Sequence, residues 1–398
     1  MAIPGLAGRD GIGAGGREMS DETSQPPSSV VVFRADASVE IGTGHVMRCL
    51  TLAETLKAQG IQCHFLCREH VGHLIDTIQA RGFVIHRLPV WSQQDIDDAS
   101  GSPQPSHAHW LGVSWQQDAE ACATLLRSLA PDWLVVDHYA LDARWEAAVL
   151  PARTRLLVID DLADRPHLAH LLLDQNLGRQ SEDYAGLVPV ECQVLTGPQH
   201  AVLRPEFAER RESSLTRRLR RPTIKRMLIS LGGVDKDNAT CRVLDALNDS
   251  DLPHDLEITV VMGATAPWLR EVKARAGELP WFTEVVVNVS DMARRMAEAD
   301  LAIGAAGSTS WERCCLGLPT LMLVLADNQK SIAKALDMEG AAVCLGNQEQ
   351  LVEGLSRHLS ALQVPHALYE MSVAAAQLTS GGGTLALCRA LNGESKFR

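Results

Sequence analysis

Short apolar segments and amphipathic segments alternate along the chain from about residue 29. Five apolar segments in the first half have the composition of buried strands, at residues 30–33, 61–66, 83–88, 133–136 and 156–159. Apolar positions with helical spacing lie between them, for example at 46–58, 74–80 and 117–129. This alternation predicts a parallel sheet with helices on both faces. The mostly polar segment 92–114 is expected to be a long surface loop near the open end of the sheet.

The same alternation begins again after residue 225. Strands are expected at 227–231, 258–262, 285–287, 301–303 and 321–324, with helices near 239–247 and from Pro267. We therefore predict an α/β protein with two doubly wound, Rossmann-type domains, at residues 29–205 and at 225–398 with the terminal helices. Such domains bind ligands at the carboxyl ends of their strands, so a ligand shared across an interdomain cleft is expected.

The segment 206–224 between the two domains is predicted to be a linker. The region 206–225 contains six arginines, which are Arg210, Arg211, Arg217, Arg218, Arg220 and Arg221. Two interpretations are open, a phosphate clamp at the edge of the cleft and a solvated linker helix, and the second is favoured.

Composition narrows the classes of partner. The net charge of −12 argues against a nucleic-acid surface, but not against a phosphate bound by backbone N–H groups. Residues 1–28 are rich in Gly, Ser, Pro and charge, which predicts a disordered tail, and Met19 is an alternative start. That segment lacks the apolar core of a secretory signal, and no apolar run reaches the roughly 18 residues that span a bilayer. We expect a cytoplasmic protein with reduced cysteines, no metal, no cofactor and no stable membrane association.

The first chemical signal is a glycine turn between the first predicted strand and helix. Gly42-Thr43-Gly44 follows the strand, and His45 begins the helix. Glycines allow the backbone to approach a ligand closely, and the free N–H groups of a helix start favour an anion such as phosphate. Because imidazole exchanges a proton near neutral pH, the pattern places an acid–base group beside an anion site. A tight turn with a partly exposed histidine is the alternative.

The second signal follows the predicted strand at 301–303. Gly307-Ser308-Thr309 forms a small-residue turn that caps the next helix, and Glu312 lies within its first turn or so. This predicts a second anion site across the cleft, so that a diphosphate contacts both helix starts. Glu312 then accepts hydrogen bonds from ribose hydroxyls, or it only stabilises the helix start. Asn328 and Gln329 suit sugar hydroxyl and acetamido groups, or they form a plain helix cap.

Several segments, specific together though not singly, resemble one known family. They are Phe33-Arg34-Ala-Asp36, Ile41-Gly-Thr-Gly44-His45 with Arg48, Val136-Asp137-His138-Tyr139, Ile159-Asp160-Asp161-Leu-Ala-Asp164-Arg165, Leu173-Asp174-Gln175-Asn176-Leu-Gly178, Leu203-Arg204-Pro205-Glu206-Phe207, Leu231-Gly232-Gly233, Gly307-Ser308-Thr309 with Trp311-Glu312, and Asn328-Gln329. Over about residues 29–340 the chain resembles the nucleotide-sugar hydrolases of pseudaminic acid biosynthesis (PseG type). These are similar in fold to the peptidoglycan N-acetylglucosaminyltransferase, which has a two-domain GT-B architecture.

The resemblance implies hydrolysis of UDP-2,4-diacetamido-2,4,6-trideoxy-β-L-altropyranose to UDP and the free sugar, without metal and with inversion at the anomeric carbon. It implies the following roles: His45 as general base, Glu312 as a ribose contact, Gln329 as a donor-sugar contact and the backbone of Val289 as a uracil contact. Asp36 is expected to orient His45 or to hold the water, and Tyr139 and Asn176 to contact the sugar; turn or core packing is the alternative for these three. Further expected substrate contacts are Gly44, Arg48, Gly232, Gly233, Gly307, Ser308, Thr309 and Asn328.

Two other classes of function use the same cleft. A GT-B glycosyltransferase with a UDP-amino sugar donor needs a sugar or lipid acceptor, whereas a non-catalytic nucleotide-sugar-binding protein holds its ligand without releasing UDP. The first domain shows no obvious exposed apolar or basic patch for a lipid acceptor, which favours water. We therefore expect a UDP-sugar hydrolase that serves the glycosylation of flagellin or surface glycans.

Overall fold

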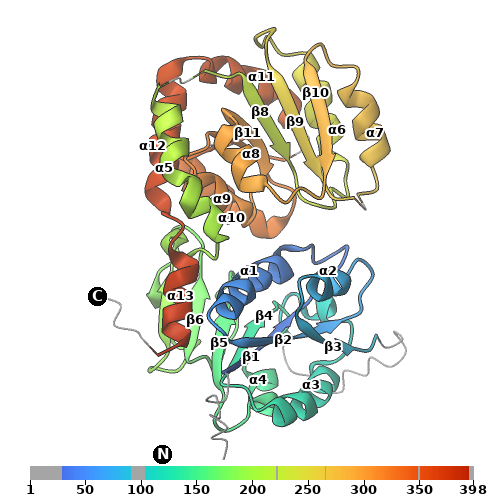
Figure 1. Cartoon of the computed structure of the whole chain (residues 1–398), viewed down its shortest axis with the longest axis vertical. Helices are drawn as coiled ribbons and strands as arrows, with labels where there is room; N and C mark the ends of the chain where they lie inside the picture. Colours follow the sequence, from blue (N-terminus) through green and yellow to red (C-terminus); the bar gives the residue numbers. More distant parts are fainter. Residues whose placement is uncertain (1–28, 91–103, 221–222, 265, 348–349, 394–398) are drawn as a thin grey trace, which may run out of the picture.

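The computed structural model describes residues 29–90, 104–220, 223–264, 266–347 and 350–393, so the predicted tail at 1–28 lies outside the described residues. Figure 1 shows two α/β domains, one above the other along the long axis of the molecule. Among the described residues, no helix is both long and apolar enough to cross a membrane.

The first domain contains a parallel sheet of seven strands in the order β3-β2-β1-β4-β5-β6-β7. Its strands are β1 Val30–Ala35, β2 Gln62–Arg68, β3 Val84–Leu88, β4 Trp133–Asp137, β5 Arg155–Ile159, β6 Leu171–Asp174 and β7 Gln193–Thr196. Its helices are α1 Gly44–Ala58, α2 Ile75–Ala80, α3 Trp115–Leu129 and α4 Ala143–Val149, with short 3-10 turns η2 Ala108–Leu111, η3 Ser181–Tyr184 and η4 Pro198–His200. The strand order reverses between β1 and β4, and ligands bind at the carboxyl ends of strands at such a point.

The second domain repeats this plan with six strands in the order β10-β9-β8-β11-β12-β13, all parallel. Its strands are β8 Arg226–Ser230, β9 Glu257–Met262, β10 Phe282–Val287, β11 Leu301–Ala305, β12 Thr320–Leu323 and β13 Val343–Cys344. Its helices are α6 Ala239–Asn248, α7 Leu269–Ala276, α8 Met292–Glu298, α9 Thr309–Cys315, α10 Lys330–Met338, α11 Leu351–Leu362 and α12 Pro365–Leu378, with the 3-10 turn η5 Asp327–Gln329. The reversal lies between β8 and β11.

Helices cover both faces of the first sheet, and this explains its continuous apolar strands. Phe33 of β1 packs in the core that contains Leu50 of α1, whereas Val32 packs in the opposite core with Leu126 of α3. Successive strand residues point to opposite faces, so a strand buried on both sides is apolar at most of its positions, and in β1 and β4 the polar residues gather near the carboxyl end. The polar residues at the carboxyl ends of β1 and β4 are therefore positioned by strands that are packed on both faces.

The segment predicted as a linker is mostly the helix α5, Pro205–Arg220, and this helix packs on the second domain. Three of its arginines donate to backbone carbonyls there: Arg211 to Cys315, Ala376 and Thr379, Arg217 to Ala297 and Ala299, and Arg218 to Met296, Ala299 and Leu316. Carbonyls at helix ends lack intrahelical partners, so a cation satisfies them. These arginines anchor α5, and neither a phosphate clamp nor a solvated linker describes them; Arg221 lies outside the described residues.

The last helix, α13 (Gly383–Leu391), was predicted with the second domain but packs on the first. The indole N–H of Trp133 donates to the carbonyl of Leu391 at 2.8 Å, and the Thr384 hydroxyl donates to the carbonyl of Leu203 at 2.6 Å. Figure 1 shows α12 beside α5 on the second domain and α13 beside the first. The chain therefore crosses between the domains twice, before α5 and before α13.

Candidate functional site

His45 lies at the start of α1, directly after the glycine turn that follows β1. Its Nδ1 atom is 2.6 Å from Oδ1 of Asp137, the last residue of β4, and its side chain is 9% exposed. A ring nitrogen bonded to a carboxylate carries the proton, which leaves Nε2 free to accept one. The pair therefore has the geometry of a general base with an orienting carboxylate.

Arg48, one turn further along α1, binds both carboxylate oxygens of Asp137. Its Nε donates to Oδ2 at 2.5 Å and its Nη2 donates to Oδ1 at 2.7 Å. Burial favours a higher pKa for Asp137, but the charges and hydrogen bonds of Arg48 and His45 outweigh burial and hold this pKa below its ordinary value. Asp137 is therefore ionised at neutral pH, as an orienting carboxylate must be.

Asp161, in the loop after β5, extends the network. It accepts from Arg48 Nη2 at 2.8 Å and from the Tyr139 hydroxyl at 2.6 Å, and the Asn176 side-chain amide donates to its backbone carbonyl at 3.2 Å. The Tyr139 ring stands edge-on to the His45 ring, with centroids 4.6 Å apart. Burial, followed by the neighbouring Asp161 charge, raises the pKa of Tyr139, so its hydroxyl stays protonated as a donor.

The structure does not bring Asp36 to His45, contrary to the expectation that it orients the histidine. Ala35 of β1 is in register with Asp137 of β4, so Asp36, one residue on, points to the opposite face of the sheet. There it is fully buried, 2.7 Å from Arg34 Nη1, and accepts the backbone N–H of Arg68 at 2.7 Å. Burial favours a higher pKa for Asp36, but the Arg34 charge holds the pKa well below the ordinary value. Asp36 thus belongs to a buried ion network.

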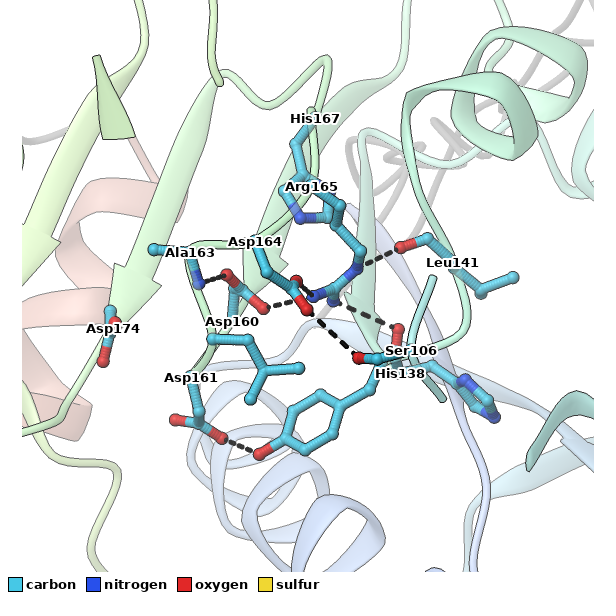
Figure 2. A network of polar contacts seen from close by, with 12 residues as sticks. Ser106, His138, Leu141, Asp160, Asp161, Ala163, Asp164, Arg165, His167 and Asp174 are labelled. Atoms are coloured by element: carbon cyan, nitrogen blue, oxygen red, sulfur yellow. Dashed lines mark hydrogen bonds and ion pairs between the residues drawn. The ribbon is translucent and has the colours of Figure 1, made fainter. Parts of the chain in front are cut away.

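A second network fixes the loop that presents Asp161 (Figure 2). The Arg165 guanidinium lies 2.9 Å from both Asp160 and Asp164, and its Nε donates to the carbonyl of Leu141 at 2.8 Å. Asp160 also accepts the N–H of Ala163, whose φ of 52° is unfavourable for a residue with a side chain. These contacts hold the loop in a conformation that it would not adopt alone.

The predicted contacts of the second domain all follow strand ends at one edge of its sheet. Gly232 and Gly233 follow β8, Val289 follows β10, the turn Gly307-Ser308-Thr309 follows β11, and Asn328 and Gln329 follow β12. Gly232 has a φ of 100°, which favours glycine. Within this group, the side-chain oxygen of Gln329 accepts the N–H of Leu325 at 2.9 Å, while Asn328 is exposed.

The glycine turns of the two domains face each other. A Cβ atom placed on Gly44 would lie 3.9 Å from the hydroxyl oxygen of Ser308, so the starts of α1 and α9 are neighbours. Glu312 in α9 is half-buried, and burial raises its pKa to about 7 against the opposing charges of Arg204 and Arg313. A carboxyl of this kind has unused hydrogen-bonding capacity and suits a ligand that donates to it.

No role was predicted for Asp137 or Asp161, although both lie in segments that carry the family resemblance. The signal for them is an aspartate at or just after the carboxyl end of each of two adjacent strands: Asp137 is the last residue of β4, and Asp161 is the second residue after β5. Trp110 lies in the segment 92–114, which was predicted to be a long surface loop near the open end of the sheet. In the structure the Trp110 ring stacks on Tyr139, with centroids 5.6 Å apart.

Comparison with known proteins gives a consistent result. Residues 236–381 match the glycosyltransferase family 28 C-terminal domain. The UDP-2,4-diacetamido-2,4,6-trideoxy-beta-L-altropyranose hydrolase of Campylobacter jejuni is 25% identical over 314 residues, which cover 79% of this chain and 98% of that protein. The UDP-N-acetylglucosamine--N-acetylmuramyl-(pentapeptide) pyrophosphoryl-undecaprenol N-acetylglucosamine transferase of Nitrosospira multiformis is 25% identical over 358 residues, 86% of this chain and 93% of that protein.

The solved structures show the same architecture. MurG of Acinetobacter baumannii has a TM-score of 0.65 and 19% identity, covering 92% of this chain and all of that chain. At this level of identity the likeness shows the fold, and the predicted α/β class with two domains of GT-B type is confirmed. The predicted resemblance to the hydrolase is also confirmed. The chain is thus a two-domain protein with the GT-B fold, its residues 236–381 match the glycosyltransferase family 28 C-terminal domain, and most of its length resembles the Campylobacter jejuni hydrolase.

Proposed function

We propose that the protein is a UDP-sugar-processing enzyme, and specifically that it hydrolyses UDP-2,4-diacetamido-2,4,6-trideoxy-β-L-altropyranose to UDP and the free sugar. The observation that carries this proposal is the His45–Asp137 pair at the interface of the domains, opposite the start of α9. The similarity to the Campylobacter jejuni hydrolase supports the choice of substrate.

In this mechanism His45 is the general base. Its Nδ1–H donates to Asp137, and its Nε2 takes a proton from a water molecule. The water oxygen forms a bond to the anomeric carbon on the face opposite UDP, while the bond from that carbon to the diphosphate oxygen breaks with its electron pair. The product is therefore the inverted anomer. UDP is a stable leaving group, so the mechanism requires no strong general acid.

The remaining residues bind and position the substrate. Asp137 fixes the tautomer of His45 and balances the charge of the imidazolium that forms. Backbone N–H groups at the two glycine turns face the diphosphate, and Glu312 accepts the ribose hydroxyls. Asn328, Gln329 and the backbone of Val289 complete the nucleotide and sugar contacts. We expect this reaction to proceed in EDTA.

The test measures the rate of UDP release from the UDP-sugar by the wild type and its variants, without an acceptor. A general base typically contributes on the order of 10² to 10⁴ in rate, so His45→Gln should lower kcat by this factor while UDP still binds. The matched control is His366→Gln, because His366 is an exposed histidine of α12 that pairs with Glu370. Full activity of His45→Gln would remove His45 from the mechanism.

A glycosyltransferase is the second candidate, because the Nitrosospira multiformis transferase matches over 86% of this chain. The two candidates differ in the acceptor. A hydrolase releases UDP at the same rate with or without a sugar or lipid acceptor, whereas a transferase requires one. A protein that binds UDP-sugar and releases no UDP under either condition would be a binding protein.

A further inference from the structure

Trp110 and His107 form an aromatic surface beside His45, which we call the Trp110 platform. Both residues come from the stretch before α3 that the sequence pattern assigned to a surface loop. The Trp110 ring stacks on Tyr139 at an interplanar angle of 21°, and the His107 ring lies 4.4 Å from Trp110 between centroids. The Trp110 centroid is 6.3 Å from that of His45.

Tyr139 itself has little surface to offer a ligand. It is 5% exposed, its hydroxyl donates to Asp161, and its ring is contacted by both His45 and Trp110. Trp110 is only half-buried. The aromatic surface available next to the general base is therefore that of the Trp110 platform, and not that of Tyr139.

Residues on both sides of Trp110 in the sequence contact neighbouring loops of the first domain. His109 Nε2 lies 3.0 Å from Glu40 in the turn after β1, and the Ser106 hydroxyl donates to Asp164 in the loop after β5 at 3.2 Å (Figure 2). Leu111, next to Trp110, is buried in the core under α3 and α4. Trp110 is thus held in place before any ligand arrives, which reduces the entropy lost on binding.

The chemistry of the substrate fits such a surface, and this step rests on the proposed function. A hexose with acetamido groups at C2 and C4 and a methyl at C6 keeps only the C3 hydroxyl free once C1 is linked to UDP. It presents methyl and C–H groups, which pack on an aromatic ring better than on polar side chains. A sugar whose anomeric carbon lies near His45 is within reach of Trp110.

We propose that Trp110 contacts the sugar and selects UDP-sugars that carry methyl groups, above all the 6-deoxy position, over their hydroxylated analogues. Removal of one methyl contact in an apolar site changes discrimination by on the order of 10-fold or more. Trp110→Ala should therefore weaken binding of the sugar and leave binding of UDP nearly unchanged.

The experiment measures both affinities in a His45→Gln background, so that the UDP-sugar survives calorimetry. Trp110→Ala should raise the dissociation constant of the UDP-sugar about 10-fold and that of UDP by less than about 2-fold. Trp110→Phe, which keeps an aromatic face, should recover most of the affinity. Trp268→Ala is the matched control, since Trp268 is a partly exposed tryptophan of the second domain. Thermal unfolding confirms that each variant is folded.

A second measurement distinguishes direct contact between Trp110 and the sugar from an indirect effect in which Trp110 only holds Tyr139 in place. With His45 intact, Trp110→Ala should reduce about 10-fold the ratio of kcat/KM for the 6-deoxy sugar to kcat/KM for its 6-hydroxy analogue. An unchanged ratio, or an equal loss of affinity for UDP and UDP-sugar, would overturn the platform. If the parent protein binds UDP but neither binds nor hydrolyses the UDP-sugar, the proposed function fails together with the platform.

Discussion

Glu312→Gln tests whether the Glu312 carboxyl serves ligand binding and lowers the stability of the ligand-free protein. Burial raises the pKa of Glu312 from its ordinary value of 4.5 to about 7. The difference of about 2.5 pH units corresponds to ~3 kcal/mol at about 1.36 kcal/mol per unit. Because the side chain is only half-buried, solvent screening lowers this figure, and we expect ~1–3 kcal/mol.

The direction in which Glu312 changes stability with pH follows from the number of protons that the folded and unfolded states bind. A carboxyl whose pKa is higher in the folded state binds more protons when folded, so its contribution to stability falls as the pH rises from about 4.5 to about 7. Glutamine resembles the protonated carboxyl and does not titrate. The free energy of unfolding of Glu312→Gln should therefore be close to that of the wild type near pH 4.5 and exceed it by ~1–3 kcal/mol at pH 8.

Urea unfolding of both proteins at the two pH values measures this difference directly. Calorimetry provides the functional half of the test, because ribose hydroxyls donate to an ionised Glu312. At pH 6 the terminal phosphate of UDP also titrates, and it does so with both proteins, so the contribution of Glu312 is the difference between them. Binding of UDP to the wild type should release close to one proton more than binding to Glu312→Gln, and the substitution should weaken binding about 10-fold or more. An equal stability difference at both pH values, or release of the same number of protons by the two proteins, would refute this account of Glu312.

Two further substitutions separate the roles of the two buried aspartates. Asp137→Asn should lower kcat on the order of 10²- to 10⁴-fold, and by no more than His45→Gln does, with an unchanged UDP dissociation constant, because the amide no longer fixes the tautomer of His45; steady-state kinetics with less than a tenfold loss would remove Asp137 from this role. Asp36→Asn should lower the free energy of unfolding by about 3 kcal/mol, because Arg34 loses a buried partner, while kcat at a temperature where the protein is folded stays within about threefold. Loss of turnover in Asp36→Asn at wild-type stability would contradict the assignment.

The fold was largely predictable because its strands are buried on both faces. Such strands are mostly apolar, and the sequence shows the central ones clearly. The strands β6, β7 and β13 were not predicted. β7 and β13 are edge strands whose positions are mostly half-buried, and β6 is a Leu-Leu-Leu-Asp segment without β-branched residues, so none of the three shows a clear strand pattern. The placement of α5 and α13 was also not predictable, because the apolar residues on one face of a helix do not indicate which of the two domains that face packs against.

The site residues that belong to a local sequence pattern were predictable, and those placed by contacts between distant segments were not. His45 and Glu312 each stand in a turn-to-helix pattern that can be read directly. The choice between Asp36 and Asp137 depends on the register of β1 against β4, which only the assembled sheet defines. Trp110 lies in a segment without periodicity, and its position beside Tyr139 becomes visible only in three dimensions.

The central claim is hydrolysis by water at the anomeric carbon. Proton NMR of the purified protein with UDP-2,4-diacetamido-2,4,6-trideoxy-β-L-altropyranose, in EDTA and without an acceptor, tests it most directly. We predict that UDP and the free sugar form together and that the anomer opposite to that of the substrate appears first. An unchanged spectrum over hours, with UDP binding demonstrated in the same sample, would contradict the claim.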